Sequence, residues 1–307
     1  MARSPRSVNR QAVKERLSSE GHTAYEGPKD KCLRSNRRRG WIPHGRGVDE
    51  CGGGTAPGMI NHLTTDVSNG VQTVRFDRME AENALTSAMC EAAADAVAFG
   101  ESSSRVRAIL LVGTPGLFTS GHDRLELEGF ARDGSFGQSV LRLSKTLATI
   151  DKPVIAAVDG PVFGFGTTLL LLCDYVVASE WASFAAPFVD IGLTPDAGAS
   201  LLAPRLLGYH RAFGLLVMGD HFDARQAREA GLVNRVVPPE EVESAGQDAA
   251  YSLAAKPPEA VRAVRRLMRG ERREVAQRID QEAASFTELL KSPAARDALQ
   301  AYIDQQR

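Results

Sequence analysis

The sequence predicts an α/β fold with a mainly parallel β-sheet in the middle of the chain and a helical region after it. Short apolar runs at residues 106–112, 153–158 and 175–178 have the length and composition of buried strands, and helix-like stretches separate them. Such alternation favours parallel strands joined by right-handed crossovers. After about residue 197 the periodicity becomes almost entirely helical.

The first elements that the sequence predicts are a hairpin and a helix. Residues 71–76 alternate between apolar and polar side chains, as in a half-buried strand. The Asn69–Gly70 pair before them is a turn signal, which indicates a hairpin with the preceding strand. Thr86 has the right chemistry for the N-cap of a helix that runs to about Phe99.

The later elements follow the same reasoning. We expect helices at residues 136–149 and 166–173 between the apolar strands, and then a series of helices. The pair Pro257–Pro258 suits the first turn of one of them. The expected C-terminal helices cover residues 199–207, 211–218, 274–291 and 294–304. The expected domain layout is an extension at 1–58, a core at 59–245 and a helical region at 246–307.

Composition excludes several classes of protein. Hydrophobic residues make up 43% of the 307 residues, which is enough for a sizeable core. The four cysteines (Cys32, Cys51, Cys90 and Cys173) show neither Cys-x-x-Cys nor zinc-site spacing, so we predict no metal site and a reduced, cytoplasmic setting. No apolar run is long enough for a membrane span, and no signal peptide is recognisable.

The first 58 residues differ from the rest in composition. Residues 1–50 carry 12 basic and 6 acidic side chains, a net charge of +6, which leaves −7 for the remainder. A segment so rich in Arg, Ser and Gly cannot bury enough apolar surface to offset its ordering entropy. Three interpretations stay open: translation starts at Met59, the segment is a tail without a role, or it is a targeting or nucleic-acid-binding arm.

Two glycine turns carry most of the functional signal. Residues 118–123 (Phe-Thr-Ser-Gly-His-Asp) and residues 159–166 (Asp-Gly-Pro-Val-Phe-Gly-Phe-Gly) each follow a predicted strand and precede a helix-like stretch. This arrangement leaves backbone N–H groups free for a ligand. Two such turns facing each other could form an oxyanion hole. The spacing fits neither a dinucleotide-binding fingerprint nor a P-loop.

The residue patterns of these two turns resemble those of the crotonase (enoyl-CoA hydratase/isomerase) superfamily. Further stretches that resemble the family are residues 191–198, 201–208 and 224–237. The resemblance implies a spiral of ββα turns with a C-terminal helical region, an acyl-CoA thioester substrate, and no cofactor apart from the coenzyme A of that substrate. It also implies a homotrimer or a dimer of trimers, although a helical cap on the same subunit fits the sequence pattern equally well.

The resemblance assigns roles to several residues. The oxyanion donors would be the backbone N–H groups of Ser120 and Phe165. The two glutamates that hold water in the hydratases of the family would fall at Thr168 and Phe188. Since neither side chain can act as an acid or a base toward water, the usual hydratase mechanism is disfavoured.

Asp196 is the one carboxylate at a position that the family uses for catalysis. The resemblance aligns it with the acid of enoyl-CoA isomerases and ring-modifying members. A single base suffices to shift a double bond, because the proton that it removes beside the thioester carbonyl can be returned further along the chain. The alternative is that Asp196 simply caps a helix beginning at Ala197.

The remaining expected contacts concern substrate binding, and His122 is expected to touch coenzyme A rather than to act as a base. Arg265 resembles a residue that meets the phosphates of coenzyme A, and a solvated helix face is the alternative. The expected substrate-binding residues are Phe118, Gly121, His122, Asp123, Gly164, Thr168, Phe188 and Arg265.

The favoured function is therefore an enoyl-CoA isomerase. Within enzymes, the alternatives are a hydratase or other thioester-enolate chemistry, such as ring isomerisation or hydrolysis. Outside enzymes, the alternatives are a non-catalytic acyl-CoA-binding protein and an RNA-binding relative. The charge of −7 on the part of the chain after residue 50 speaks against nucleic acid as a partner, and no membrane partner is expected.

Overall fold

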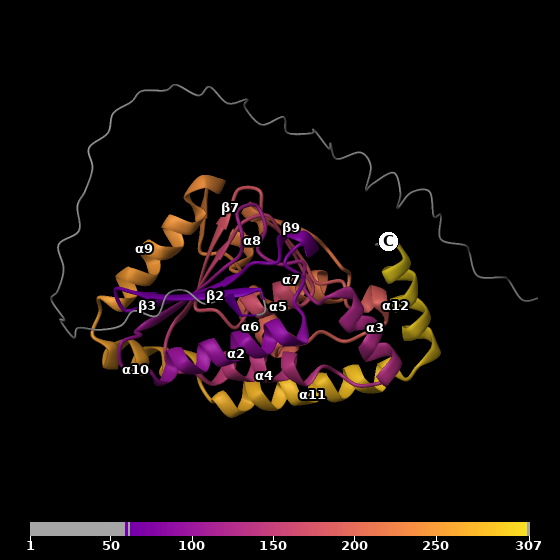
Figure 1. Ribbon diagram of the computed structural model, residues 1–307. Helices are drawn as coiled ribbons and strands as arrows, with labels where there is room; N and C mark the ends of the chain where they lie inside the picture. The colour runs from indigo at the N-terminus through magenta and orange to yellow at the C-terminus, as the bar shows by residue number, and fades with distance from the viewer. Residues whose placement is uncertain (1–58, 61, 306–307) are drawn as a thin grey trace, which may run out of the picture. The chain divides into compact units, whose positions relative to one another are not determined.

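A seven-stranded sheet with the order β1-β2-β3-β4-β5-β7-β10 organises the fold (Figure 1). The computed structural model describes residues 59–60 and 62–305, so the prediction for residues 1–58 lies outside the described residues. The strands are β1 (Met59–Ile60), β2 (Leu63–Ser68), β3 (Val71–Phe76), β4 (Ala108–Val112), β5 (Val154–Val158), β7 (Tyr175–Ser179) and β10 (Arg235–Val237). A smaller sheet contains β6 (Pro161–Phe163), β8 (Ser183–Ala185) and β9 (Phe222–Asp223).

The pairing of the strands confirms the expected hairpin and the mainly parallel sheet. Strands β2 and β3 pair antiparallel around Asn69 and Gly70, which both have positive φ values of 50° and 82°. Strands β3, β4, β5, β7 and β10 pair parallel. Every residue of β4 and β5 is buried, because helices cover both faces of the parallel part.

The helices form a layer on each face of the large sheet. One face packs against α9, and the opposite side carries α2, α4 and α11 (Figure 1). The helices are α2 (Ser87–Ser102), α3 (Arg124–Asp133), α4 (Gln138–Thr149), α5 (Phe165–Leu170), α6 (Ala199–Leu207), α7 (Tyr209–Leu216), α8 (Ala224–Ala230), α9 (Val242–Ala254), α10 (Pro258–Arg269), α11 (Arg272–Leu290) and α12 (Pro293–Gln305). Short 3-10 turns are η1 (Met79–Ala81), η2 (Val189–Ile191) and η3 (Pro239–Glu241).

Local signals in the sequence explain where several helices begin. The side chain of Thr86 accepts a hydrogen bond from the backbone N–H of Met89, as expected for the N-cap of α2. Pro258 opens α10 directly after Pro257. Strands β6, β8, β9 and β10 escaped prediction, because runs of two or three residues become strands through pairing rather than through their own composition.

The C-terminal helices pack against segments that are distant from them in the sequence. Helix α11 packs against α4 and α6, and α12 packs against α3 and η2. The boundary predicted at residue 245 falls inside α9, which packs on the sheet as part of the core. Among the described residues, no helix combines the length and the apolar character that crossing a membrane requires.

Candidate active site

The structure brings the two glycine turns together. Strands β4 and β5 are parallel neighbours, so the turns that follow them leave the sheet at the same edge. Thr119 in the first turn forms an isolated bridge with Val162 in the second. A Cβ atom on Gly121 would stand only 2.5 Å from the carbonyl oxygen of Phe163. The close approach of the two turns therefore requires glycine at position 121.

Only one of the two expected oxyanion donors is available. The N–H of Ser120 donates to the carbonyl oxygen of Glu82 at 3.1 Å, so the structure does not support Ser120 in this role. The N–H of Phe165, in the first turn of α5, has no acceptor among the described residues. Ser120 is nevertheless close to the site, since it lines the pocket described below.

The N–H of His122 is a second unengaged donor, which sequence reasoning missed. Its neighbours are both engaged with Leu85, whose N–H donates to the oxygen of Gly121 at 2.7 Å and whose oxygen accepts from the N–H of Asp123 at 3.0 Å. The N–H of His122 itself has no acceptor within the described part of the chain. The signal was present in the sequence, because His122 directly follows the glycine that allows the two turns to meet.

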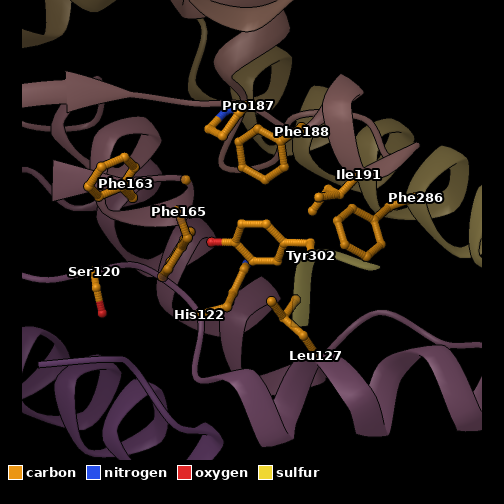
Figure 2. A pocket seen from close by; sticks show the side chains of 11 residues that line it. Ser120, His122, Leu127, Phe163, Phe165, Pro187, Phe188, Ile191, Phe286 and Tyr302 are labelled. Atoms are coloured by element: carbon orange, nitrogen blue, oxygen red, sulfur yellow. The ribbon is translucent and has the colours of Figure 1, made fainter. Parts of the chain in front are cut away.

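A small, mostly apolar pocket of about 40 Å³ lies beside these turns (Figure 2). A cavity needs only about 10–15 Å³ to hold one water molecule, so this one is open but narrow. Aromatic rings dominate its walls, and they come from both turns, from the segment before η2 and from the C-terminal helices. The lining residues are Ser120, His122, Leu127, Phe163, Gly164, Phe165, Pro187, Phe188, Ile191, Phe286 and Tyr302.

Asp196 lies next to the pocket but does not line it. Asp196 is only 2% exposed, and its Oδ2 lies 2.9 Å from Nε2 of His122. Its Oδ1 lies 2.5 Å from Oγ1 of Thr168. Since His122 lines the pocket and Asp196 does not, the carboxylate meets the pocket through the imidazole.

The alternative role of Asp196 as a helix cap is not what the structure shows. Helix α6 begins at Ala199 rather than Ala197, and no side chain of its own segment caps it. Glu282 of α11 takes that role instead, accepting hydrogen bonds from the N–H of Gly198 at 2.6 Å and of Ser200 at 2.8 Å. The carboxylate of Asp196 is therefore left for His122 and Thr168.

Glu282 is a buried acid that the sequence gave no reason to select. Burial raises the pKa of its carboxyl group from 4.5 to about 7, although the hydrogen bonds from Ser200 and Gly198 act in the opposite direction. These bonds hold a turn in which Ala197 and Gly198 both have positive φ values, 58° and 78°. Glu282 thus anchors the unusual turn that presents Asp196.

The side chain of His122 is buried in an aromatic cluster. Its ring stacks on the ring of Phe165, with centroids 4.9 Å apart and planes 7° apart. Phe130 and Phe136 meet it edge-on. Its side chain is 5% exposed, and Nδ1 is buried without a hydrogen-bond partner among the described residues.

Two residues expected to bind substrate have structural partners within the protein. Phe118 is fully buried and packs edge-on against Phe76 in the core. Asp123 caps α3 by accepting from the N–H of Leu125 at 2.9 Å, and it forms an ion pair with Arg78 at 2.6 Å. Neither residue lines the pocket.

Arg265 is also placed differently from the expectation. It is 8% exposed, its Nε donates to Asp174 at 2.8 Å, and its guanidinium donates to the carbonyl oxygen of Ile150. It lines a separate hollow of about 900 Å³ beside α10 rather than the pocket. Its guanidinium is therefore engaged inside the protein, where it shares Asp174 with Arg269, whose Nε lies 3.0 Å from that carboxylate. A contact with the phosphates of coenzyme A stays a prediction. Gly164, Phe165 and Phe188, in contrast, line the pocket.

Comparisons with known proteins relate the chain to one family. A family model described as enoyl-CoA hydratase/isomerase matches residues 66–307. The 1,2-epoxyphenylacetyl-CoA isomerase of Escherichia coli (strain K12) is 35% identical over 207 residues, which cover 65% of this chain and 78% of that protein. The 4-chlorobenzoyl coenzyme A dehalogenase-2 of Arthrobacter sp is 32% identical over 206 residues, 64% of this chain and 74% of that protein. The solved structure of Pseudomonas aeruginosa OdaA superimposes with a TM-score of 0.75 at 37% identity, and the match covers 79% of this chain and 98% of OdaA.

Proposed function

Because the chain belongs to the enoyl-CoA hydratase/isomerase family and is an acyl-CoA enzyme of that family, we propose that it shifts a carbon–carbon double bond in an acyl-CoA thioester. In this reaction the N–H groups of His122 and Phe165 bind the thioester oxygen. A proton leaves the carbon beside the carbonyl, and the electron pair of the broken C–H bond moves into an enolate that the two N–H groups stabilise. The same proton returns further along the acyl chain, which moves the double bond. Coenzyme A enters as part of the substrate.

The observation that carries the proposal is the environment of Asp196. It is buried, it caps no helix, and its two carboxylate oxygens form hydrogen bonds with His122 and Thr168 beside the pocket. Burying a carboxylate is costly, so a buried acid with no capping role is a strong candidate for proton transfer. The turn that holds it is stabilised by an acid from another helix, Glu282.

Hydration is the weaker alternative. It requires an acid and a base that hold a water molecule at the double bond. The resemblance to the family places these groups at Thr168 and Phe188. Thr168 is bonded to Asp196, and Phe188 contributes an apolar wall to the pocket.

A ring-containing acyl group is a second candidate substrate for the same enolate chemistry. Five side chains that line the pocket are aromatic, namely Phe163, Phe165, Phe188, Phe286 and Tyr302. Aromatic walls pack well against a flat ring. The names of the two relatives above refer to 1,2-epoxyphenylacetyl and 4-chlorobenzoyl thioesters of coenzyme A, so thioesters of both kinds belong in the assay.

The test compares the full-length protein with two variants, Asp196→Asn and the control Asp190→Asn. Asp190 lies on η2 nearby, is exposed and does not line the pocket. With 3-enoyl-CoA substrates, we expect isomerisation to fall about 10²- to 10⁴-fold in Asp196→Asn and to be unchanged in Asp190→Asn. Hydration of 2-enoyl-CoA that persists in Asp196→Asn would contradict the proposal. Turnover of neither substrate by the wild type would also contradict it.

A further inference from the structure

We propose that the imidazole of His122, with Nδ1 as the proton-accepting atom, carries the proton to and from the acyl group while Asp196 positions the ring. This inference rests on the proposed function above and assigns its proton transfer to a different atom. It reverses the expectation that His122 only contacts coenzyme A.

The first argument is position. His122 lines the pocket, whereas Asp196 is 2% exposed and does not. Nε2 of the ring lies 2.9 Å from the nearer carboxylate oxygen, so the imidazole packs directly against the carboxylate. An acyl group in the pocket therefore meets the imidazole first.

The second argument is the hydrogen-bond pattern at the carboxylate. An ionised carboxylate only accepts hydrogen bonds, and Asp196 has two partners, the hydroxyl of Thr168 and Nε2 of His122. Nε2 must then carry the hydrogen, and Nδ1 carries the lone pair. The tautomer is assigned from this network. Nδ1 is buried and has no partner among the described residues, so no group of the protein uses its lone pair. The proposal requires an acyl group in the pocket to reach this edge of the ring.

The third argument is that the ring is held in one orientation. Phe165 stacks on one face of the imidazole at 4.9 Å, and Phe130 and Phe136 pack edge-on around it. Asp196 fixes one edge of the ring through Nε2. A proton carrier needs this kind of restraint, because its distance to the substrate must stay within hydrogen-bond reach.

The fourth argument is that one residue can reach both reacting atoms of the enolate, the thioester oxygen and the carbon beside the carbonyl. The backbone N–H groups of His122 and Phe165 have no acceptor within the described residues, and both residues line the pocket. The carbon that loses the proton is bonded directly to the carbonyl carbon. A residue whose N–H binds the carbonyl oxygen thus has its own side chain within a short distance of that carbon.

The proton transfer balances without any other reactant. Nδ1 takes the proton from the carbon beside the carbonyl, and the electrons of that C–H bond form the enolate. The resulting imidazolium is stabilised by the carboxylate of Asp196. The N–H bond at Nδ1 then breaks, the proton joins the carbon at the far end of the conjugated system, and the ring is neutral again.

Two substitutions separate this proposal from direct proton transfer by Asp196. In His122→Gln, the amide nitrogen can replace Nε2 as the donor to Asp196, but no basic nitrogen remains. In His122→Ala, the ring that stands between Asp196 and the pocket is removed. If His122 only covers Asp196, the alanine variant keeps or gains activity; if His122 carries the proton, both variants lose it.

The assay is exchange of the proton beside the carbonyl of a saturated acyl-CoA with deuterium from D₂O, measured by mass spectrometry together with isomerisation of 3-enoyl-CoA. We expect both rates to fall at least about 100-fold in both variants, with acyl-CoA binding retained by calorimetry. Added imidazole should restore part of the rate in His122→Ala and none in His122→Gln.

An alanine variant as active as the wild type would overturn the proposal and leave the proposed function intact, with Asp196 acting directly. If His122→Ala does not fold, His122→Gln decides alone, since near-wild-type exchange in that variant also overturns the proposal. A wild type that shows neither exchange nor isomerisation would overturn the proposed function, and this inference with it.

Discussion

Replacing Glu282 by Gln tests how the turn that presents Asp196 is held. The carboxylate accepts from the N–H of Gly198 at 2.6 Å, and from the N–H and the hydroxyl of Ser200 at 2.8 and 2.6 Å. A glutamine has one oxygen instead of two, so at least one of the two N–H groups loses its acceptor. Such a loss costs about 1–3 kcal/mol. The carboxamide, however, removes an acid that is costly to ionise where it lies.

The pH dependence of the free energy of unfolding gives a second, better-defined magnitude for the effect of Glu282. The pKa of Glu282 is raised from 4.5 to about 7, with burial as the largest cause. Between these pH values the native protein keeps a proton that the unfolded chain has lost, so the free energy of unfolding falls as pH rises. At roughly 1.4 kcal/mol for each tenfold change in the ionisation constant, the full effect is on the order of 3 kcal/mol. It is present below pH 4.5 and lost by about pH 7.

The assay is urea unfolding from pH 4.5 to pH 8 for the wild type, Glu282→Gln and the control Glu288→Gln. Glu288 lies on the same helix, and its side chain is 76% exposed. We expect the wild type to lose stability relative to Glu282→Gln as pH rises, and to keep a constant offset from Glu288→Gln. A stability difference from Glu282→Gln that stays flat, or that grows in favour of the wild type toward pH 8, would refute the reasoning.

Two further predictions follow from single residues. Asn83→Ala should destabilise the protein by about 2–4 kcal/mol in urea unfolding. The side-chain amide of Asn83 donates to the carbonyl oxygens of Leu117 and Phe118 at 3.1 and 3.2 Å, and its φ is +50°. An effect below about 1 kcal/mol would contradict this prediction. Phe165→Leu should raise the kcat/KM for larger acyl groups by about tenfold relative to that for small ones, because the ring of Phe165 narrows the pocket. The measurement is kcat/KM for a series of acyl-CoA thioesters of increasing size. An unchanged ratio between large and small substrates would contradict the prediction.

The sheet and many helices could be predicted because their signals are local. The apolar runs of β4 and β5 match their buried strands, and Thr86 caps α2 as its chemistry suggests. The family resemblance, carried by the two glycine turns, correctly gave the fold and the class of enzyme.

The interior of the site could not be predicted in the same way, because its partners are distant in sequence. Asp196 is 74 residues from His122 and 28 from Thr168, and the cap of α6 comes from Glu282 on α11. Nothing in the local sequence indicates which of these will meet. The partners of Asp123, Phe118 and Arg265 could not be predicted for the same reason, since each lies elsewhere in the chain.

The most direct test of the account is a double-mutant cycle on exchange of the proton beside the carbonyl in D₂O, with the wild type, Asp196→Asn, His122→Gln and the double variant. Groups that act as one unit show strongly non-additive losses. The account predicts that the double variant is about as slow as the slower single variant. Losses that multiply would contradict it, because Asp196 and His122 would then act independently.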